Sequence, residues 1–275
     1  MNAIWTSSGV RLRLRAHREG DLNWLFLPGG PGIGSESLFE LIDAVAVPGS
    51  SWAVDLPGDG SNVGVECDPF AAWPQVLIEA AEAVPNPVYV GHSTGGMYLL
   101  STPALEPLLR GLVLVSTAPD ASWLPAFVDM TRSHPLPAVD EATEAYAADP
   151  SDERLREIAV RSAPWNFTPE GVAAGAELLA RMPYNGAAVD WSDRNFDSVY
   201  AAAWWPRELP TLIVSGGEDR IVTQRLWEDA RFEGPNVMRR EIAGGAHFPW
   251  IERPEDVRAA FDALTQALTE LSASS

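Results

Sequence analysis

The segment Gly91-His92-Ser93-Thr94-Gly95 directly follows the apolar run Val88-Tyr89-Val90. Such a run predicts a buried strand, and the residues from Gly95 to Leu105 favour a helix. Because a strand that turns straight into a helix leaves little space around the turn, only small residues fit on either side of Ser93. The turn lifts the Ser93 hydroxyl out at the carboxyl end of a sheet, where the positive N-terminus of the helix also points. The motif therefore predicts a sheet-and-helix fold with Ser93 as a candidate nucleophile.

Short apolar runs alternate with helical patterns along most of the chain. Residues 3–16 fit a β-hairpin, and the further runs that predict strands are Trp24–Leu27, Ser51–Asp55, Gly111–Ser116, Thr211–Val214 and Val237–Ile242. Helical patterns cover about 69–84 and a closing segment that begins at Pro254. Strands that alternate with helices in this way predict a mostly parallel, doubly wound α/β sheet.

The alternation stops between about residues 119 and 208, where helical patterns, prolines and five tryptophans replace the apolar runs. We interpret residues 119–208 as a helical cap, or lid, inserted into the sheet domain. The core domain then consists of residues 1–118 and 209–275. A chain of 275 residues is long enough to bury one large core of this kind.

A serine hydroxyl is a weak nucleophile at neutral pH and needs a neighbouring base. His247 follows the last predicted strand and precedes the final helix, which is true of none of the other three histidines. Asp219 follows the strand Thr211–Val214. We therefore predict a triad in which Ser93 attacks, His247 moves the proton and Asp219 orients His247. Glu218 and Asp193 are alternative candidates for the acid.

Stabilising the negative charge of a reaction intermediate requires two backbone N–H groups that point at it. Thr94, the residue after the nucleophile, is expected to supply one of them. The loop after the strand Trp24–Leu27 reads Pro28-Gly29-Gly30-Pro31-Gly32, and its glycines let the backbone approach a substrate closely. We predict that Gly30 supplies the second donor of this oxyanion hole, with Gly29 as the alternative.

With these motifs the chain resembles the α/β-hydrolase superfamily over nearly its whole length. The loop Gly29–Gly32 is similar to the His-Gly-Gly-Pro-Gly signature of the proline iminopeptidase-like branch. However, Pro28 stands where that signature has histidine, and Thr94 stands where those peptidases typically carry tryptophan. The elbow Gly-His-Ser-Thr-Gly-Gly is closer to capped esterases, lactonases and carbon–carbon hydrolases. The resemblance implies an α/β-hydrolase fold and a serine hydrolase that works without a cofactor.

The expected reaction is cleavage of a small or medium carboxylic ester, thioester or lactone through an acyl-enzyme on Ser93. One alternative is an aminopeptidase of the proline iminopeptidase kind, in which an acid such as Glu141, Glu144 or Asp190 holds the substrate amine. Others are a carbon–carbon bond hydrolase that uses the same triad and a non-catalytic ligand-binding protein on this fold. A serine nucleophile argues against haloalkane dehalogenases and epoxide hydrolases, which use aspartate.

Aromatic residues are the candidates for a pocket that binds an apolar acyl or aromatic part of the substrate. These candidates are Trp123, Trp165, Phe167, Trp204 and Trp250, with the core of the cap as their alternative location. His92 is expected to pack beneath the elbow and to face away from Ser93.

The net charge of −19, with arginine but no lysine, argues against binding to nucleic acid or to an anionic membrane. Lack of lysine also excludes Schiff-base chemistry on this chain. Cys67, the single cysteine, permits no intrachain disulfide and no thiolate metal cluster, so we expect no metal site. Since we find neither a membrane-span pattern nor a signal peptide, we expect a cytoplasmic protein that acts on a small molecule. The sequence leads us to no prediction of oligomeric state.

Overall fold

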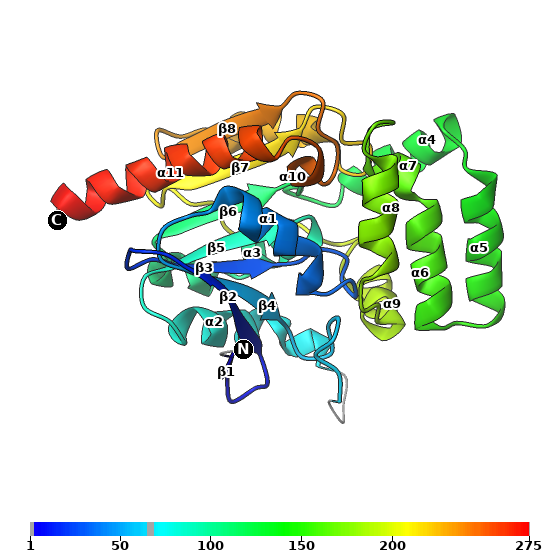
Figure 1. Cartoon of the computed structure of the whole chain (residues 1–275), viewed down its shortest axis with the longest axis horizontal. Helices are drawn as coiled ribbons and strands as arrows, with labels where there is room; N and C mark the ends of the chain where they lie inside the picture. Colours follow the sequence, from blue (N-terminus) through cyan, green and yellow to red (C-terminus); the bar gives the residue numbers. More distant parts are fainter. Residues whose placement is uncertain (1–2, 65–68, 275) are drawn as a thin grey trace.

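The computed structural model of the chain describes residues 3–64 and 69–274, so the single cysteine, Cys67, lies outside the described residues (Figure 1). The strands are β1 (Ala3–Trp5), β2 (Arg11–His17), β3 (Asn23–Leu27), β4 (Ser50–Asp55), β5 (Pro87–His92), β6 (Gly111–Val115), β7 (Thr211–Gly216) and β8 (Val237–Ile242). They form one sheet in the order β1-β2-β4-β3-β5-β6-β7-β8. Strands β1 and β2 are antiparallel to their neighbours, and the other six strands are parallel. The predicted α/β sheet is confirmed.

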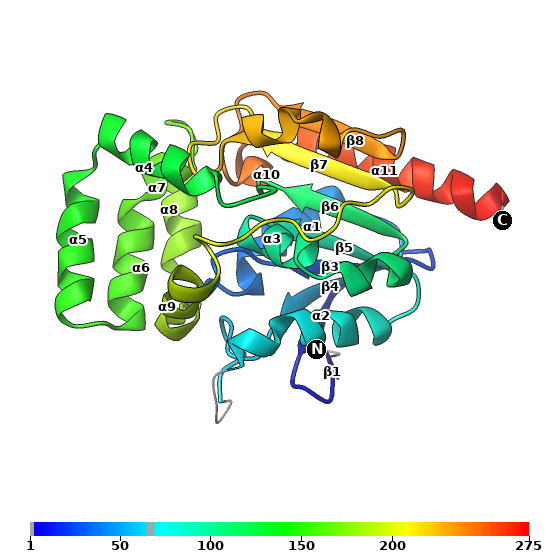
Figure 2. The same ribbon diagram turned by 180° about the vertical axis from the view of Figure 1, so that it is seen from behind.

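Helices cover both faces of this sheet. They are α1 (Phe39–Val45), α2 (Trp73–Glu82), α3 (Thr94–Leu100), α4 (Trp123–Ser133), α5 (Pro137–Ala148), α6 (Asp152–Arg161), α7 (Ala163–Asn166), α8 (Val172–Ala180), α9 (Gly186–Asn195), α10 (Pro249–Glu252) and α11 (Pro254–Ser274). Helices α1 and α11 lie on one face (Figure 1), and α2 and α3 lie on the other (Figure 2). The carboxyl ends of the parallel strands point towards helices α4–α9 (Figure 2).

Two predicted helices are shorter in the structure than the sequence indicated. The helix expected over 69–84 is a 3₁₀ turn, η2 (Phe70–Ala72), followed by α2. The helix expected to reach Leu105 ends at Leu100, and a second 3₁₀ turn, η3 (Pro103–Leu108), follows it. Proline has no backbone N–H and fixes its own φ angle, so Pro103 begins a new turn instead of continuing α3.

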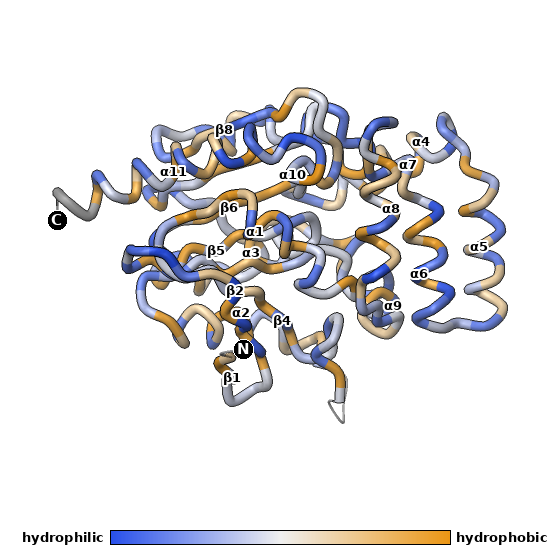
Figure 3. The backbone as a smooth tube through the Cα atoms, in the orientation of Figure 1, coloured by the Kyte–Doolittle hydropathy of each residue, from blue (hydrophilic) through white to orange (hydrophobic). Residues whose placement is uncertain are grey.

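Alternation of side chains along the strands divides the core into two apolar layers. In β3, Trp24 and Phe26 pack in the layer beneath α1 and α11, whereas Leu25 and Leu27 pack in the layer beneath α2. All four side chains are buried, as expected for a parallel sheet that is covered on both faces. Hydrophobic colours dominate β6 in the middle of the sheet, whereas α5 and α6 alternate between hydrophilic and hydrophobic (Figure 3).

Residues 119–208 leave the sheet after β6 and return before β7. The two ends of this segment lie side by side, because the Ala121 amide donates to the Tyr200 carbonyl (2.8 Å) and the Ala202 amide donates to the Pro119 carbonyl (2.8 Å). Between these ends run helices α4–α9, which we call the helical segment (Figure 1). Within residues 3–64 and 69–274, no helix has both the length and the apolar character needed to cross a membrane.

Candidate active site

The turn between β5 and α3 has the sharp geometry that its sequence predicts. Ser93 has φ 52° and ψ −127°, a conformation that side-chain-bearing residues rarely adopt. A Cβ atom on Gly91 would come within 2.6 Å of the Gly96 Cα, and one on Gly95 would come within 2.3 Å of the Pro28 carbonyl oxygen. Glycine is therefore required on both sides of Ser93.

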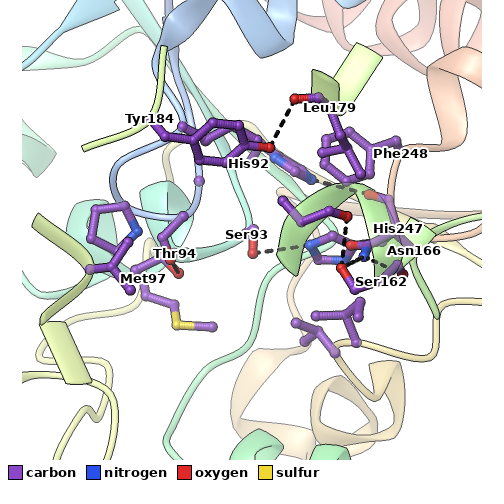
Figure 4. Close-up of a pocket in the computed structure, with 18 of the residues that line it drawn as sticks. His92, Ser93, Thr94, Met97, Ser162, Asn166, Leu179, Tyr184, His247 and Phe248 are labelled. Atoms are coloured by element: carbon purple, nitrogen blue, oxygen red, sulfur yellow. Dashed lines mark hydrogen bonds between the residues drawn. The ribbon is translucent and has the colours of Figure 1, made fainter. Parts of the chain in front are cut away.

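Two hydrogen bonds link Ser93 to His247 and His247 to Asp219 at the carboxyl edge of the sheet. His247 Nε2 is 3.1 Å from Ser93 Oγ, a contact drawn as a dashed line in Figure 4, and His247 Nδ1 is 3.0 Å from Asp219 Oδ2. Asp219 Oδ1 accepts the backbone amides of Ile221 (2.9 Å) and Val222 (3.0 Å). Since a carboxylate can only accept hydrogen bonds, the contact with Asp219 favours the tautomer of His247 that carries its proton on Nδ1 and leaves Nε2 free to accept from Ser93.

Hydrogen bonds that the sequence did not predict, made by Asn166, His92 and Glu252, hold the backbone around His247. The His247 amide donates to the Asn166 carbonyl (3.1 Å), and His92 Nε2 donates to the His247 carbonyl (3.1 Å). The Glu252 carboxylate accepts the amides of Ala246 and Thr168, each at 2.6 Å. The loop that carries His247 is thereby tied to the helical segment at two places.

His92 lies in the wall of the active-site cavity, which differs from the expectation that it faces away from Ser93 (Figure 4). Its ring centroid is 4.9 Å from that of His247. Burial, followed by the nearby His247, lowers the pKa of His92 well below its ordinary value. His92 is therefore a neutral hydrogen-bond donor that holds His247 in place.

The loop Gly29–Gly32 packs directly on Ser93. A Cβ atom on Gly29 would lie 2.6 Å from the Ser93 Cβ, while the Gly30 carbonyl accepts a hydrogen bond from the Thr94 hydroxyl (3.1 Å). Gly30 has φ 111°, which favours glycine. The structure thus brings together all three candidate oxyanion-hole residues, Gly29, Gly30 and Thr94. Thr94 begins α3, where the first amides of a helix have no intrahelical partner.

A cavity of about 240 Å³ opens beside Ser93. Helical-segment residues that line it include Trp123, Leu155, Ala159, Leu179 and Val189, and the other walls include Met97, Ile221, Val222 and Phe248. Ser162 and Asn166 add polar atoms, and the Tyr184 hydroxyl donates to the Leu179 carbonyl (3.0 Å) above them (Figure 4). No Asp, Glu or Arg occurs among the described residues that line this cavity.

Four of the five aromatic residues proposed for the pocket do not line this cavity. Trp204 donates to the Leu99 carbonyl and packs in the layer beneath α2. Trp165 donates to the His134 carbonyl and packs edge-on against Phe127. Phe167 and Trp250 pack against Phe248, behind the cavity wall. Of the five, only Trp123 lines the cavity; apolar composition did not distinguish core positions from lining positions.

The alternative acids also lie away from Ser93. Glu218 is exposed beside Asp219, and Asp193 lies on α9, where burial raises its pKa. Among the acids considered for binding a substrate amine, Glu141 lies 3.7 Å from Arg161 and Asp190 lies 3.2 Å from Arg194. Glu144 is exposed on α5, so none of these three acids faces the cavity.

A family of known proteins matches the part of the chain that contains Ser93, Asp219 and His247. The model of the family described as "Alpha/beta hydrolase family" matches residues 24–260, which include the elbow, Asp219 and His247. The chain belongs to the alpha/beta hydrolase family. The predicted superfamily is thus confirmed, and the protein is a hydrolase.

Curated relatives of the hydrolase carry the name pimeloyl-[acyl-carrier protein] methyl ester esterase. The relative from Xanthomonas oryzae pv. oryzae is 26% identical over 238 residues, which is 80% of this chain and 86% of the relative. The relative from Xylella fastidiosa is 25% identical over 226 residues, which is 76% of this chain and 82% of the relative.

Among solved structures, the proline iminopeptidase-related protein from Thermus thermophilus aligns with a TM-score of 0.72 at 21% identity, covering 97% of both chains. The esterase RhEst1 from Rhodococcus sp. ECU1013 aligns with a TM-score of 0.68 at 16% identity, covering 97% of this chain and 98% of the esterase. At these identities the likeness concerns the fold that the hydrolase shares with both proteins.

Asp59, in the loop after β4, is a buried carboxyl beside the site. Its Oδ1 accepts the Gly32 amide (2.8 Å), and burial raises its pKa to about 7, with Asp55 and Glu36 acting in the same direction. The pKa of an aspartate in an unfolded chain is about 3.9, so folding favours the protonated form. The stabilising contribution of the protonated group is complete below about pH 4 and is lost as the pH rises through 7.

We expect Asp59→Asn, which cannot ionise, to become more stable relative to the unaltered hydrolase as the pH rises. Between pH 5 and pH 8, the difference in unfolding free energy should shift by about 2–4 kcal/mol in favour of the variant. Urea unfolding at both pH values measures this shift. Asp262→Asn, at an exposed position of α11, is the control and should show no such change. Equal differences at both pH values would contradict the prediction.

Proposed function

We propose that the hydrolase cleaves a small or medium carboxylic ester, thioester or lactone through an acyl-enzyme on Ser93. The observation that carries the proposal is the hydrogen-bonded series Ser93–His247–Asp219, which opens into an apolar cavity without Asp, Glu or Arg in its described lining. The curated relatives bear the name of an esterase, which supports an ester as the substrate.

In the first half of the proposed reaction, Ser93 Oγ attacks the carbonyl carbon and His247 Nε2 takes the hydroxyl proton. The carbonyl oxygen becomes an oxyanion, for which the amide of Thr94 and that of Gly30 or Gly29 are the proposed donors. His247 then passes its proton to the leaving alcohol or thiol as the bond to the acyl carbon breaks. Asp219 keeps the imidazolium oriented and stabilises its charge without taking the proton.

In the second half, water attacks the acyl carbon and gives a proton to His247. The same donors stabilise the second oxyanion. The bond between the acyl carbon and Ser93 Oγ then breaks, the serine recovers its proton from His247, and the carboxylic acid leaves.

We propose that residues 119–208 act as the cap and that the remainder, 1–118 and 209–275, is the hydrolase core. Support comes from the paired ends of the segment at Ala121–Tyr200 and Pro119–Ala202 and from the cavity walls that α4 and α6 supply. The substrate would thus be enclosed between the cap and the carboxyl edge of the sheet.

The cavity lining favours an uncharged acyl group. Burying an isolated charge without a partner is costly, and no Asp, Glu or Arg of the described lining is available to pair with one. This argues against the aminopeptidase alternative, which requires an acid for the substrate amine. The name of the curated relatives specifies a methyl ester, an uncharged group that the apolar walls fit.

Treatment with a fluorophosphonate probe tests the proposed nucleophile. The probe should phosphonylate Ser93 in the folded hydrolase as fluoride leaves, which peptide mass spectrometry would show, and it should not label Ser93→Ala. Labelling of His247→Ala should be slower by at least about 100-fold, because the hydroxyl loses its base. Absence of labelling, or an equal rate in His247→Ala, would contradict the proposal.

A substrate panel separates the alternatives. Uncharged acyl methyl and p-nitrophenyl esters and lactones should be hydrolysed faster than matched esters whose acyl chain ends in a carboxylate or an amine. Prolyl arylamides should be turned over slowly. Faster turnover of prolyl arylamides than of short esters would favour the peptidase, and tight binding without turnover would favour a ligand-binding protein.

A further inference from the structure

The loop Gly29–Gly32 belongs to no helix or strand, so its position depends on individual hydrogen bonds. The Thr94 hydroxyl holds the Gly30 carbonyl from the side of the elbow. Two further residues, Asp59 and Asn185, hold Gly32, and neither lines the active-site cavity.

Asp59 holds Gly32 from the side of the sheet. Asp59 Oδ1 accepts the Gly32 amide at 2.8 Å, and the side chain is buried. The loop that carries Asp59 is itself braced, because the Asn62 amide donates to the Asp59 carbonyl (2.9 Å) and the Gly58 amide donates to the Asn62 carbonyl (2.9 Å). A Cβ atom on Gly60 would lie 2.3 Å from the Gly34 Cα, so the two loops are in direct contact.

Asn185 holds Gly32 from the side of the helical segment. Its backbone amide donates to the Gly32 carbonyl (2.8 Å), and its side-chain Nδ2 donates to the Gly58 carbonyl. Its Oδ1 accepts the Ala187 amide at 3.1 Å and thereby caps α9. One residue therefore connects the start of α9 with both loops.

We propose that Asp59 and Asn185 are positioning residues that fix the oxyanion loop Gly29–Gly32 against Ser93. The inference rests on the proposed function and goes beyond it, because neither residue touches the reacting atoms. Donors of an oxyanion hole act only when they are held in place before the charge develops. Gly32 is two residues from Gly30, so releasing either bond at Gly32 lets the loop move relative to Ser93.

The rate at which a fluorophosphonate phosphonylates Ser93, with loss of fluoride, tests the proposal, because the phosphonyl oxygen of the probe occupies the oxyanion position. Asp59→Ala removes the acceptor of the Gly32 amide and should lower the maximal labelling rate by about 10–100-fold, with little change in the probe concentration at half-maximal rate. Asp59→Asn keeps a carbonyl oxygen for that amide and should restore the rate to within about threefold.

Asn185→Ser removes the hydrogen bond from Nδ2 to the Gly58 carbonyl but keeps the backbone bond to Gly32 and an oxygen that can cap α9. Serine can still cap α9 but cannot reach the Gly58 carbonyl as Nδ2 does, so a loss of about threefold to tenfold is expected. Asp197→Ala is the matched control. Asp197 is a partly buried carboxyl that accepts a hydrogen bond from Ser192 Oγ (2.8 Å), and burial raises its pKa to about 6; its side-chain hydrogen bonds go to residues of α9 and not to the oxyanion loop. Its loss should destabilise the fold without slowing the labelling.

Measurements should be made well below the unfolding temperature of each variant. An unchanged labelling rate in Asp59→Ala, or equal losses of rate in Asp59→Ala and Asp197→Ala, would overturn the inference. Failure of Asp59→Asn to recover would also overturn it. The proposed function would still stand if the unaltered hydrolase were labelled at Ser93. If the unaltered hydrolase is not labelled at Ser93, the proposed function fails and the inference fails with it.

Discussion

Replacing Ser93 with alanine should lower kcat for an accepted ester by roughly 10⁶-fold, and His247→Ala should cost about as much, because each residue is useless without the other. His247 Nε2 lies 3.1 Å from Ser93 Oγ and has no other acceptor role in this geometry. Single-turnover kinetics with a p-nitrophenyl ester would measure both losses.

The double variant Ser93→Ala/His247→Ala tests whether the two residues act as one unit. We expect the double variant to be no slower than either single variant, since the remaining rate comes from binding and from the oxyanion donors. Losses that multiply in the double variant would mean that Ser93 and His247 act independently, and the proposed mechanism would be wrong.

Asp219→Asn should lower kcat by about 10⁴-fold while leaving the fold intact. Because the amides of Ile221 and Val222 both donate to Oδ1, the oxygen of the new amide should face them and its NH₂ group should face His247 Nδ1. Two donors cannot share that contact, so His247 must shift its proton to Nε2. An Nε2–H can no longer accept the proton of Ser93.

Glu218→Gln is the matched control for Asp219→Asn. Glu218 is the adjacent acid and is exposed, so neutralising it should leave kcat unchanged. Steady-state kinetics together with the imidazole NMR signals of His247 would distinguish a changed tautomer from a lost fold. An Asp219→Asn variant within about tenfold of the unaltered rate would remove Asp219 from the mechanism.

The features that local sequence pattern could predict are those set by short stretches of chain. Trp24–Leu27 is buried on both faces, and a continuous apolar run is what such burial requires. The elbow at Ser93 likewise depends on the space next to Gly91 and Gly95. Placement of Asp219 and His247 followed from their positions after successive strands, because parallel strands end at one edge of the sheet.

Features set by contacts between distant segments could not be predicted in this way. Asn166 and Glu252 contact the backbone around His247 from α7 and from α10, and no periodicity marks a residue that satisfies a remote amide. Trp204 shows the same limit for packing. Its apolar ring suits a pocket as well as it suits the core. In the structure, however, its indole N–H donates to the Leu99 carbonyl, and the ring packs in the core layer beneath α2.

The hydrogen bonds that tie the His247 loop to the helical segment have a consequence for how such proteins diverge. The His247 amide bonds to Asn166, and the Glu252 carboxylate bonds to Thr168. Exchanging residues 119–208 for the corresponding part of a relative would replace both of these partners. We therefore expect changes in residues 119–208 to affect the position of His247 as well as the shape of the cavity. A transplanted segment would need a carbonyl where Asn166 has one and an amide within reach of Glu252 before any new pocket shape could support catalysis.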